Sequence, residues 1–76
     1  MKYQPLFIYD GIKVTERERD VWRLLAMSEN VKAIASSLGI SQKTVEYHRS
    51  RVAKKLGMKD LASFTRKAIR SRLIKL

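Results

Sequence analysis

The side chains best suited to chemical contact lie between Ser41 and Leu56, on one side of a predicted helix. Ser41 is a suitable N-cap, and Gly57 follows the last helical residue as a suitable stop. Val45, Val52 and Leu56 are spaced to share one apolar face. The opposite face combines cations, a phenol, a hydroxyl and a carboxylate: Lys43, Glu46, Tyr47, Ser50, Arg51 and Lys54. Such a set can neutralise phosphates and read base edges in a DNA major groove. For this helix taken alone, an ordinary solvated face is the alternative.

Positive charge is concentrated in the second half of the chain. The 76 residues carry 17 Lys and Arg against 7 Asp and Glu, a formal net charge of +10. Residues 1–38 have six bases and five acids, whereas residues 39–76 have eleven bases and two acids. This asymmetry favours a polyanion partner, first of all double-stranded DNA, because neutralised phosphates release counterions. An anionic membrane surface is the rival partner.

The composition excludes several other kinds of site. The sequence has no cysteine, and His48 is its only histidine, so we expect no disulfide, no metal site and no cofactor. With one small core and no nucleophile–base pair, we expect no catalytic residues and no enzyme. No apolar run approaches the ~20 residues that span a bilayer. We therefore expect a cytoplasmic, nucleoid-associated protein with no membrane partner.

Residues 1–14 are apolar and contain a turn signal. Asp10-Gly11 separates two short apolar runs, which is the pattern of a two-residue β-hairpin. An isolated hairpin is marginal in water, so it would have to pack on the helices or on a partner. A tail or linker from a longer protein is the alternative for this segment.

Four helices are predicted in residues 15–76. The first begins at the capping box of Thr15 and Glu18 and runs to about Met27. Trp22 lies on the apolar stripe of this helix, so we expect it in the core rather than stacked on a base.

A short second helix precedes the helix predicted over 42–56. Asn30 is its candidate N-cap, and Gly39 ends it at a turn where a positive φ is accessible to glycine. Ala35 is small where the two helices would cross, and Ile40 fills the angle between them. Short helix, turn and longer helix together form a helix-turn-helix, whose second helix enters the major groove.

The fourth helix is predicted from Leu61 to about Leu73, after the N-cap Asp60. It carries two apolar stripes. One, with Leu61, Phe64 and Ala68, is expected to face the core. The other is the candidate dimerisation surface and contains Ala62, Ile69 and Leu73. The alternative is that both stripes are buried in one wide core face.

Several segments resemble the LuxR/FixJ-type DNA-binding domain. They are residues 14–22, 32–41 and 43–49, continued by 54–58, and the resemblance covers about 14–74 without gaps. It implies an all-α, four-helix helix-turn-helix domain, made of a three-helix core and a C-terminal dimerisation helix. It also implies transcription regulation by a homodimer that binds inverted-repeat DNA.

Some residues differ from those common in the family, and the resemblance also indicates the kind of regulator. Ser28, Val31 and Ala33 depart from residues common in the family, which affects local caps and one backbone contact. With no receiver domain or ligand pocket before the domain, the chain is similar to the short, stand-alone spore-regulator type or to an isolated effector domain. Whether residues 1–14 contact RNA polymerase or another regulator protein stays open.

The resemblance places Glu46, Tyr47 and Ser50 where the family reads base edges. Glu46 can accept from a cytosine amino group, or instead pair with Lys43 or Ser50. A second group is expected to contact the DNA backbone: Lys32, Lys43, Thr44, Arg49, Arg51 and Lys54. For Arg49 two alternatives remain, snorkelling beside the apolar face or pairing with Glu18. His48 is expected to pack and to form a local hydrogen bond or touch phosphate.

Two rival functions share some of these features. A sigma-factor region-4 type domain also has a basic helix-turn-helix, but it does not need the apolar surface of the fourth helix. An interaction module could instead use the basic, amphipathic last helix to bind a membrane or an acidic protein.

Overall fold

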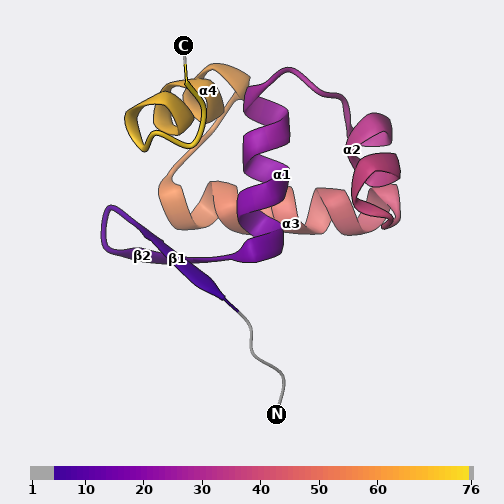
Figure 1. Ribbon diagram of the computed structural model, residues 1–76, viewed down its shortest axis with the longest axis horizontal. Helices are drawn as coiled ribbons and strands as arrows, with labels where there is room; N and C mark the ends of the chain where they lie inside the picture. The colour runs from indigo at the N-terminus through magenta and orange to yellow at the C-terminus, as the bar shows by residue number, and fades with distance from the viewer. Residues whose placement is uncertain (1–4, 76) are drawn as a thin grey trace.

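The computed structural model describes residues 5–75, in which a two-stranded hairpin precedes four helices (Figure 1). In chain order the elements are β1 (Leu6–Tyr9), β2 (Ile12–Thr15), α1 (Glu16–Ala26), α2 (Val31–Leu38), α3 (Gln42–Leu56) and α4 (Leu61–Arg70). The four-helix helix-turn-helix class is confirmed. In Figure 1, α1 crosses α3 near the centre of the molecule, with α2 on one side and α4 on the other.

Each helix starts where the sequence supplies an acceptor for an unpaired backbone N–H. The N-caps are Thr15, Asn30, Ser41 and Asp60, each of which accepts from the N–H three residues on. The predicted capping box of α1 is present, with Thr15 N–H donating to Glu18 Oε1 over 3.0 Å. Gly39 and Gly57 close α2 and α3 at φ of 67° and 68°, values that a side chain would strain.

The C-terminal end of the domain differs from the prediction. Helix α4 stops at Arg70 instead of about Leu73, because Arg72 takes a φ of 58° that cannot continue a right-handed helix. Leu73 folds back, donates its N–H to the carbonyl of Ala68 over 2.8 Å and packs against the core. Leu61 was predicted to face the core and is 54% exposed, since it occupies the first turn of α4 at the edge of the domain.

The core forms where α1 crosses α3 and α4. Trp22 is fully buried, and its indole N–H donates to the carbonyl oxygen of Phe64 over 3.0 Å, which ties α1 to α4. Val45, Val52 and Leu56 are buried on one face of α3. This confirms their predicted apolar face, and it orients the other face of α3 toward solvent.

The hairpin turn is built as its sequence indicates. Asp10 and Gly11 both have positive φ, 52° and 76°, which is the type I′ geometry that suits a two-residue hairpin. The register pairs Tyr9 with Ile12 and Phe7 with Val14. Val14 is fully buried in the core, so the hairpin packs on the helices.

Candidate nucleic-acid interface

The exposed face of α3 is continuous from its first turn to its last. Six side chains of this face are exposed: Lys43, Glu46, Tyr47, Ser50, Arg51 and Lys54. They include every residue that the sequence placed outward on this helix. Tyr47 is the most prominent apolar group among them, with 57% of its surface exposed. The face therefore presents an aromatic phenol between cations, on a helix whose opposite side is anchored in the core.

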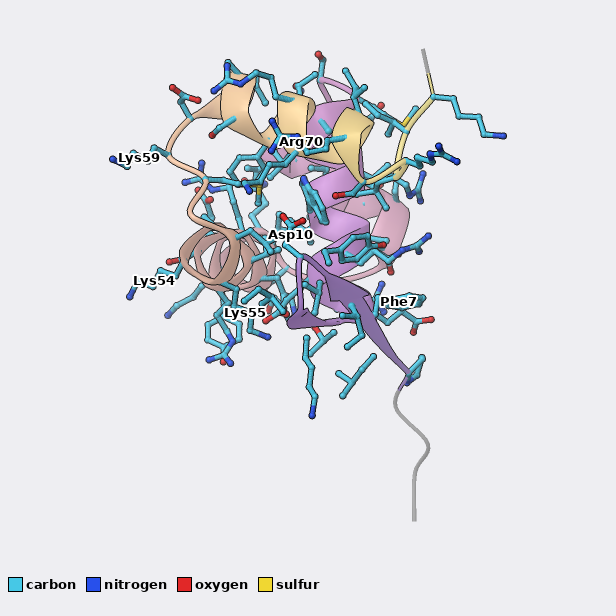
Figure 2. The ribbon with its side chains drawn as sticks, turned by 90° about the vertical axis from the view of Figure 1, so that its left-hand side faces the viewer. Phe7, Asp10, Lys54, Lys55, Lys59 and Arg70 are labelled. Carbon is cyan, nitrogen blue, oxygen red and sulfur yellow. The ribbon has the colours of Figure 1, made fainter. Side chains whose placement is uncertain are left out.

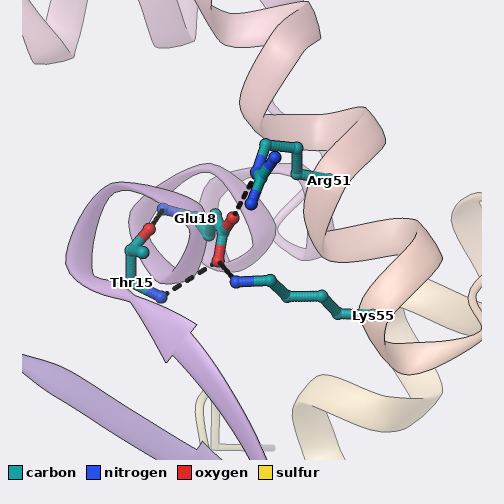
Figure 3. A network of polar contacts seen from close by, with 4 residues as sticks. All are labelled: Thr15, Glu18, Arg51 and Lys55. Atoms are coloured by element: carbon teal, nitrogen blue, oxygen red, sulfur yellow. Dashed lines mark hydrogen bonds and ion pairs between the residues drawn. The ribbon is translucent and has the colours of Figure 1, made fainter.

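A buried carboxylate fixes where that face points. Glu18 of α1 is 1% exposed, and its two oxygens accept from two residues of α3 (Figure 3). Lys55 Nζ donates to Oε1 over 2.7 Å, and Arg51 Nε donates to Oε2 over 3.2 Å. Since Glu18 also accepts from the N–H of Thr15, one side chain holds the start of α1 and the second half of α3 together. We infer that this network sets the orientation of α3 relative to the rest of the domain.

Burial by itself would raise the pKa of Glu18. The hydrogen bonds from Lys55, from the Thr15 N–H and from Arg51 outweigh that effect, and the pKa lies below its usual 4.5. Glu18 is therefore ionised at neutral pH.

Arg51 has a second contact within α3. Its guanidinium carbon lies 5.6 Å from the ring centroid of Tyr47. The Nε–H of Arg51 donates to Glu18, which fixes the guanidinium beside the Tyr47 ring. The guanidinium restrains that ring and still remains half exposed. This links Tyr47 through Arg51 to α1.

The pairings that the sequence left open for Arg49 and Glu46 are replaced by one that it did not indicate. Arg49 Nε lies 2.8 Å from Glu46 Oε1, three residues earlier on α3. Arg49 therefore does not pair with Glu18, which is already bound by Arg51 and Lys55, and Glu46 does not pair with Lys43 or Ser50. Both partners are about half exposed, so the pair is weak and can exchange for contacts with DNA.

The remaining predicted contacts divide between solvent and local structure. Lys32 is exposed on the first turn of α2. Thr44 is half-buried, and its hydroxyl lies 2.9 Å from that of the N-cap Ser41, so the side chain supports the start of α3.

Lys59 is a further cation beside the exposed face of α3, and the sequence did not predict it as a DNA contact. It is exposed in the loop between α3 and α4. Figure 2 shows Lys54 and Lys59 projecting on the same side of the molecule. Its position after Gly57, outside any helix, gave no periodicity from which its direction could be predicted.

His48 packs between the α3 face and the core, and its Nδ1 is buried without a hydrogen-bond partner among the described residues. The predicted local hydrogen bond at that nitrogen is therefore absent. Burial lowers the pKa of His48 below its usual 6.5. The charge of Glu18 opposes this, and Arg17 and Arg51 add to it.

We predict that His48 stays neutral when the unfolded chain becomes protonated. Because its folded pKa is depressed, its contribution to stability is present above about pH 6.5 and is lost as pH falls toward the folded value. An NMR titration of the imidazole should give a midpoint below 6.5, and stability relative to His48→Asn should decline from pH 7 to 5. A midpoint at or above 6.5 would contradict this.

Within residues 5–75, no helix is long and apolar enough to cross a membrane. No group of three or more His, Cys, Asp or Glu in that range is arranged to hold a metal ion.

Comparison with known proteins assigns the domain. Residues 13–68 match the sequence profile described as "Bacterial regulatory proteins, luxR family". The chain belongs to the LuxR family. This confirms the resemblance, and it favours a LuxR-type domain over a sigma-factor region-4 type. Family members are DNA-binding transcription regulators and not enzymes, so DNA-binding transcription regulation is the class of function that the match supports.

Three relatives show how far the likeness extends. The spore germination protein GerE of Bacillus subtilis is 50% identical over 46 residues, which are 60% of this chain and 62% of GerE. The transcriptional regulatory protein UhpA of Escherichia coli is 43% identical over 54 residues, 71% of this chain and 28% of UhpA. The probable transcriptional regulatory protein NarL of Mycobacterium tuberculosis is 36% identical over 61 residues, 80% of this chain and 28% of NarL. The chain thus matches less than two thirds of each relative.

Proposed function

We propose that this protein is a sequence-specific, duplex-DNA-binding transcription regulator that inserts α3 into the major groove. The observation that carries the proposal is the exposed cationic and aromatic face of α3, held by Glu18 and by a buried valine face. Glu46, Tyr47 and Ser50 are proposed to contact base edges. Lys32, Lys43, Arg49 and Lys54 are proposed to contact phosphates, together with Lys59.

Arg51 and Thr44 are still proposed to support contact with the DNA backbone, but mainly by an indirect route. Both side chains already serve the fold, Arg51 through Glu18 and Thr44 through Ser41. Their contribution to DNA binding is therefore mainly to hold α3 and its N-terminus in place, with any phosphate contact made by atoms that these bonds leave free.

The proposed binding unit is a homodimer on an inverted repeat. Two of the three residues predicted for the dimer surface remain accessible on α4: Ala62 is exposed and Ile69 is half-buried. Leu73 leaves this surface, since it packs against the core of its own domain. We propose that the protein acts in the cytoplasm on nucleoid DNA.

The test begins with duplexes selected by the protein from a random pool. On titration with a selected duplex at modest ionic strength, backbone amide shifts should move for residues 43–54 more than for the rest of the chain. Selected sites should also contain two inverted half-sites, with a spacing near one helical turn. Unmoved amides across this stretch would refute the role of α3, whereas single half-sites would refute only the dimer.

A further inference from the structure

Glu46 is the only acid of α3, and it lies on the face that is proposed to enter the DNA. The other charged side chains of that exposed face are cations, Lys43, Arg51 and Lys54. Phosphates repel a carboxylate, so an unpaired Glu46 would oppose DNA binding. A carboxylate also accepts hydrogen bonds and donates none. Its position on this face therefore requires a cation beside it and a donor on the DNA.

Arg49 is the cation that lies beside it. Its Nε is 2.8 Å from Oε1 of Glu46, three residues earlier on the same helix. Among residues 5–75, Oε2 of Glu46 has no hydrogen bond or ion pair, and neither do the terminal NH2 groups of Arg49. The pair therefore leaves one carboxylate oxygen and both NH2 groups available to the DNA.

The fold determines which of these two charges lies nearer the bases. Arg49 lines a surface cavity of about 490 Å³ between the end of α3 and the start of α4, together with Leu25 and Phe64 of the core. On α3 it lies between the buried direction of Val45 and the direction of Glu46, because successive residues turn by about 100°. When the helix lies in a major groove, Arg49 is then nearer the phosphates and Glu46 is nearer the base edges.

Cytosine is the base that the free oxygen of Glu46 fits. Cytosine presents its N4 amino group, a donor, in the major groove. Guanine presents two acceptors there, and thymine presents an acceptor and a methyl group. Adenine has an amino donor, but the N7 acceptor beside it would face a lone pair of the carboxylate. A group that can only accept therefore favours cytosine over the other three bases.

We propose that Arg49 is a positioning residue for base reading and that the Glu46–Arg49 pair selects cytosine. This rests on the proposed insertion of α3 into the major groove. Arg49 keeps its contact with Oε1 and binds a phosphate through its NH2 groups, while Oε2 accepts from the N4 amino group of one cytosine. In water the pair is weak, because both side chains are half exposed. Exclusion of water on DNA strengthens it, so Arg49 contributes to sequence preference as well as to affinity.

The first experiment finds the base that Glu46 contacts. Duplexes are selected from one random pool by the natural chain and, separately, by Glu46→Ala. One position of the selected site should lose its preference in the Glu46→Ala pool, and in the natural pool that position should be a C·G pair. An A·T pair at that position would overturn the proposal, and so would a pool in which no position changes.

The second experiment measures the part that Arg49 plays. Replacing the identified C·G pair with T·A sets an acceptor against Oε2, and the natural chain should bind this duplex about tenfold more weakly, or about 1.4 kcal/mol. In Arg49→Ala both affinities should fall, and the ratio between the duplexes should shrink to about threefold, which is half of that free energy. An arginine that only binds phosphate would weaken both duplexes equally, so an unchanged ratio would overturn the proposal.

Two further variants are the matched controls. Lys54→Ala removes a proposed phosphate contact of α3 that does not pair with Glu46, so it should lower both affinities and keep the tenfold ratio. A ratio that shrinks equally in Lys54→Ala would show that it follows overall affinity, and would overturn the positioning role. Arg49→Lys keeps a cation within reach of Glu46, so it should recover part of the ratio. A ratio as small as that of Arg49→Ala would count against the proposal in the same way.

Failure of this inference can be told apart from failure of the proposed function. If α3 does not enter the groove, the backbone amides of residues 43–54 stay unmoved on titration with DNA, and both proposals fall. If only the positioning role is wrong, a site is still selected and these amides still move, while the ratio is the same with and without Arg49. Circular-dichroism melts should match the natural chain in every variant, because the replaced side chains are exposed on α3.

Discussion

Replacing Glu18 with alanine should lower the free energy of unfolding by about 3 kcal/mol, at the low end of what breaking a buried ion pair costs. The carboxylate is 1% exposed and receives Lys55 and Arg51 from α3 and the N–H of Thr15. The cost stays at the low end because Arg51 is half exposed and can turn to solvent. Urea unfolding followed by circular dichroism measures it.

Glu18→Gln is the matched control, because glutamine can keep the capping box with Thr15 while it removes the charge. Its loss should be smaller than that of Glu18→Ala by the value of the cap, about 1 kcal/mol. Both variants should also bind the selected duplex more weakly than their stability loss explains, since α3 loses its restraint. Equal stability of Glu18→Gln and the natural chain would show that the ion pairs contribute nothing.

The ionisation of Glu18 should also make the free energy of unfolding depend on pH in the acid range. Since the folded pKa of Glu18 lies below its usual 4.5, its contribution is complete above that pH and is lost as pH falls toward the folded value. The difference in stability between the natural chain and Glu18→Gln should therefore shrink on acidification below about pH 4.5. A difference independent of pH in that range would contradict the assignment.

Tyr47→Ala should weaken binding to a selected duplex by about 10- to 100-fold, and binding to a scrambled duplex far less. The range corresponds to about 1–3 kcal/mol for one base contact. Tyr47 is exposed on α3, and its ring is restrained by Arg51, so the side chain is already positioned before DNA binds. Titrations on both duplexes at two salt concentrations provide the measurement.

Lys43→Ala is the contrasting variant on the same helix. As a phosphate contact it should weaken both duplexes about equally and reduce the slope of log affinity against log salt by about 0.9. Tyr47→Phe separates the roles of ring and hydroxyl, because it keeps the contact with Arg51. Equal losses on both duplexes for Tyr47→Ala would refute its base-reading role.

The local structure of this protein follows closely from its sequence. Thr15, Asn30, Ser41 and Asp60 start the helices as predicted, because an N-cap is a contact over three residues. The buried face of α3 also follows from spacing alone. The end of α4 was predicted too late, since the turn at Arg72 has no glycine or proline to mark it.

The set of helices, their caps and the outward residues of α3 can therefore be predicted from the amino-acid sequence. How the charges pair could be learned only from the packing of the helices. Glu18 is 33 and 37 residues from Arg51 and Lys55, and its sequence neighbourhood indicates a cap and nothing more. Likewise Leu73 suits a dimer surface by its spacing and packs on its own core instead. A cap hydrogen bond joins residues only three apart, so neighbouring residues are enough to predict it. The partner of a buried charge depends instead on which helices pack together in the core.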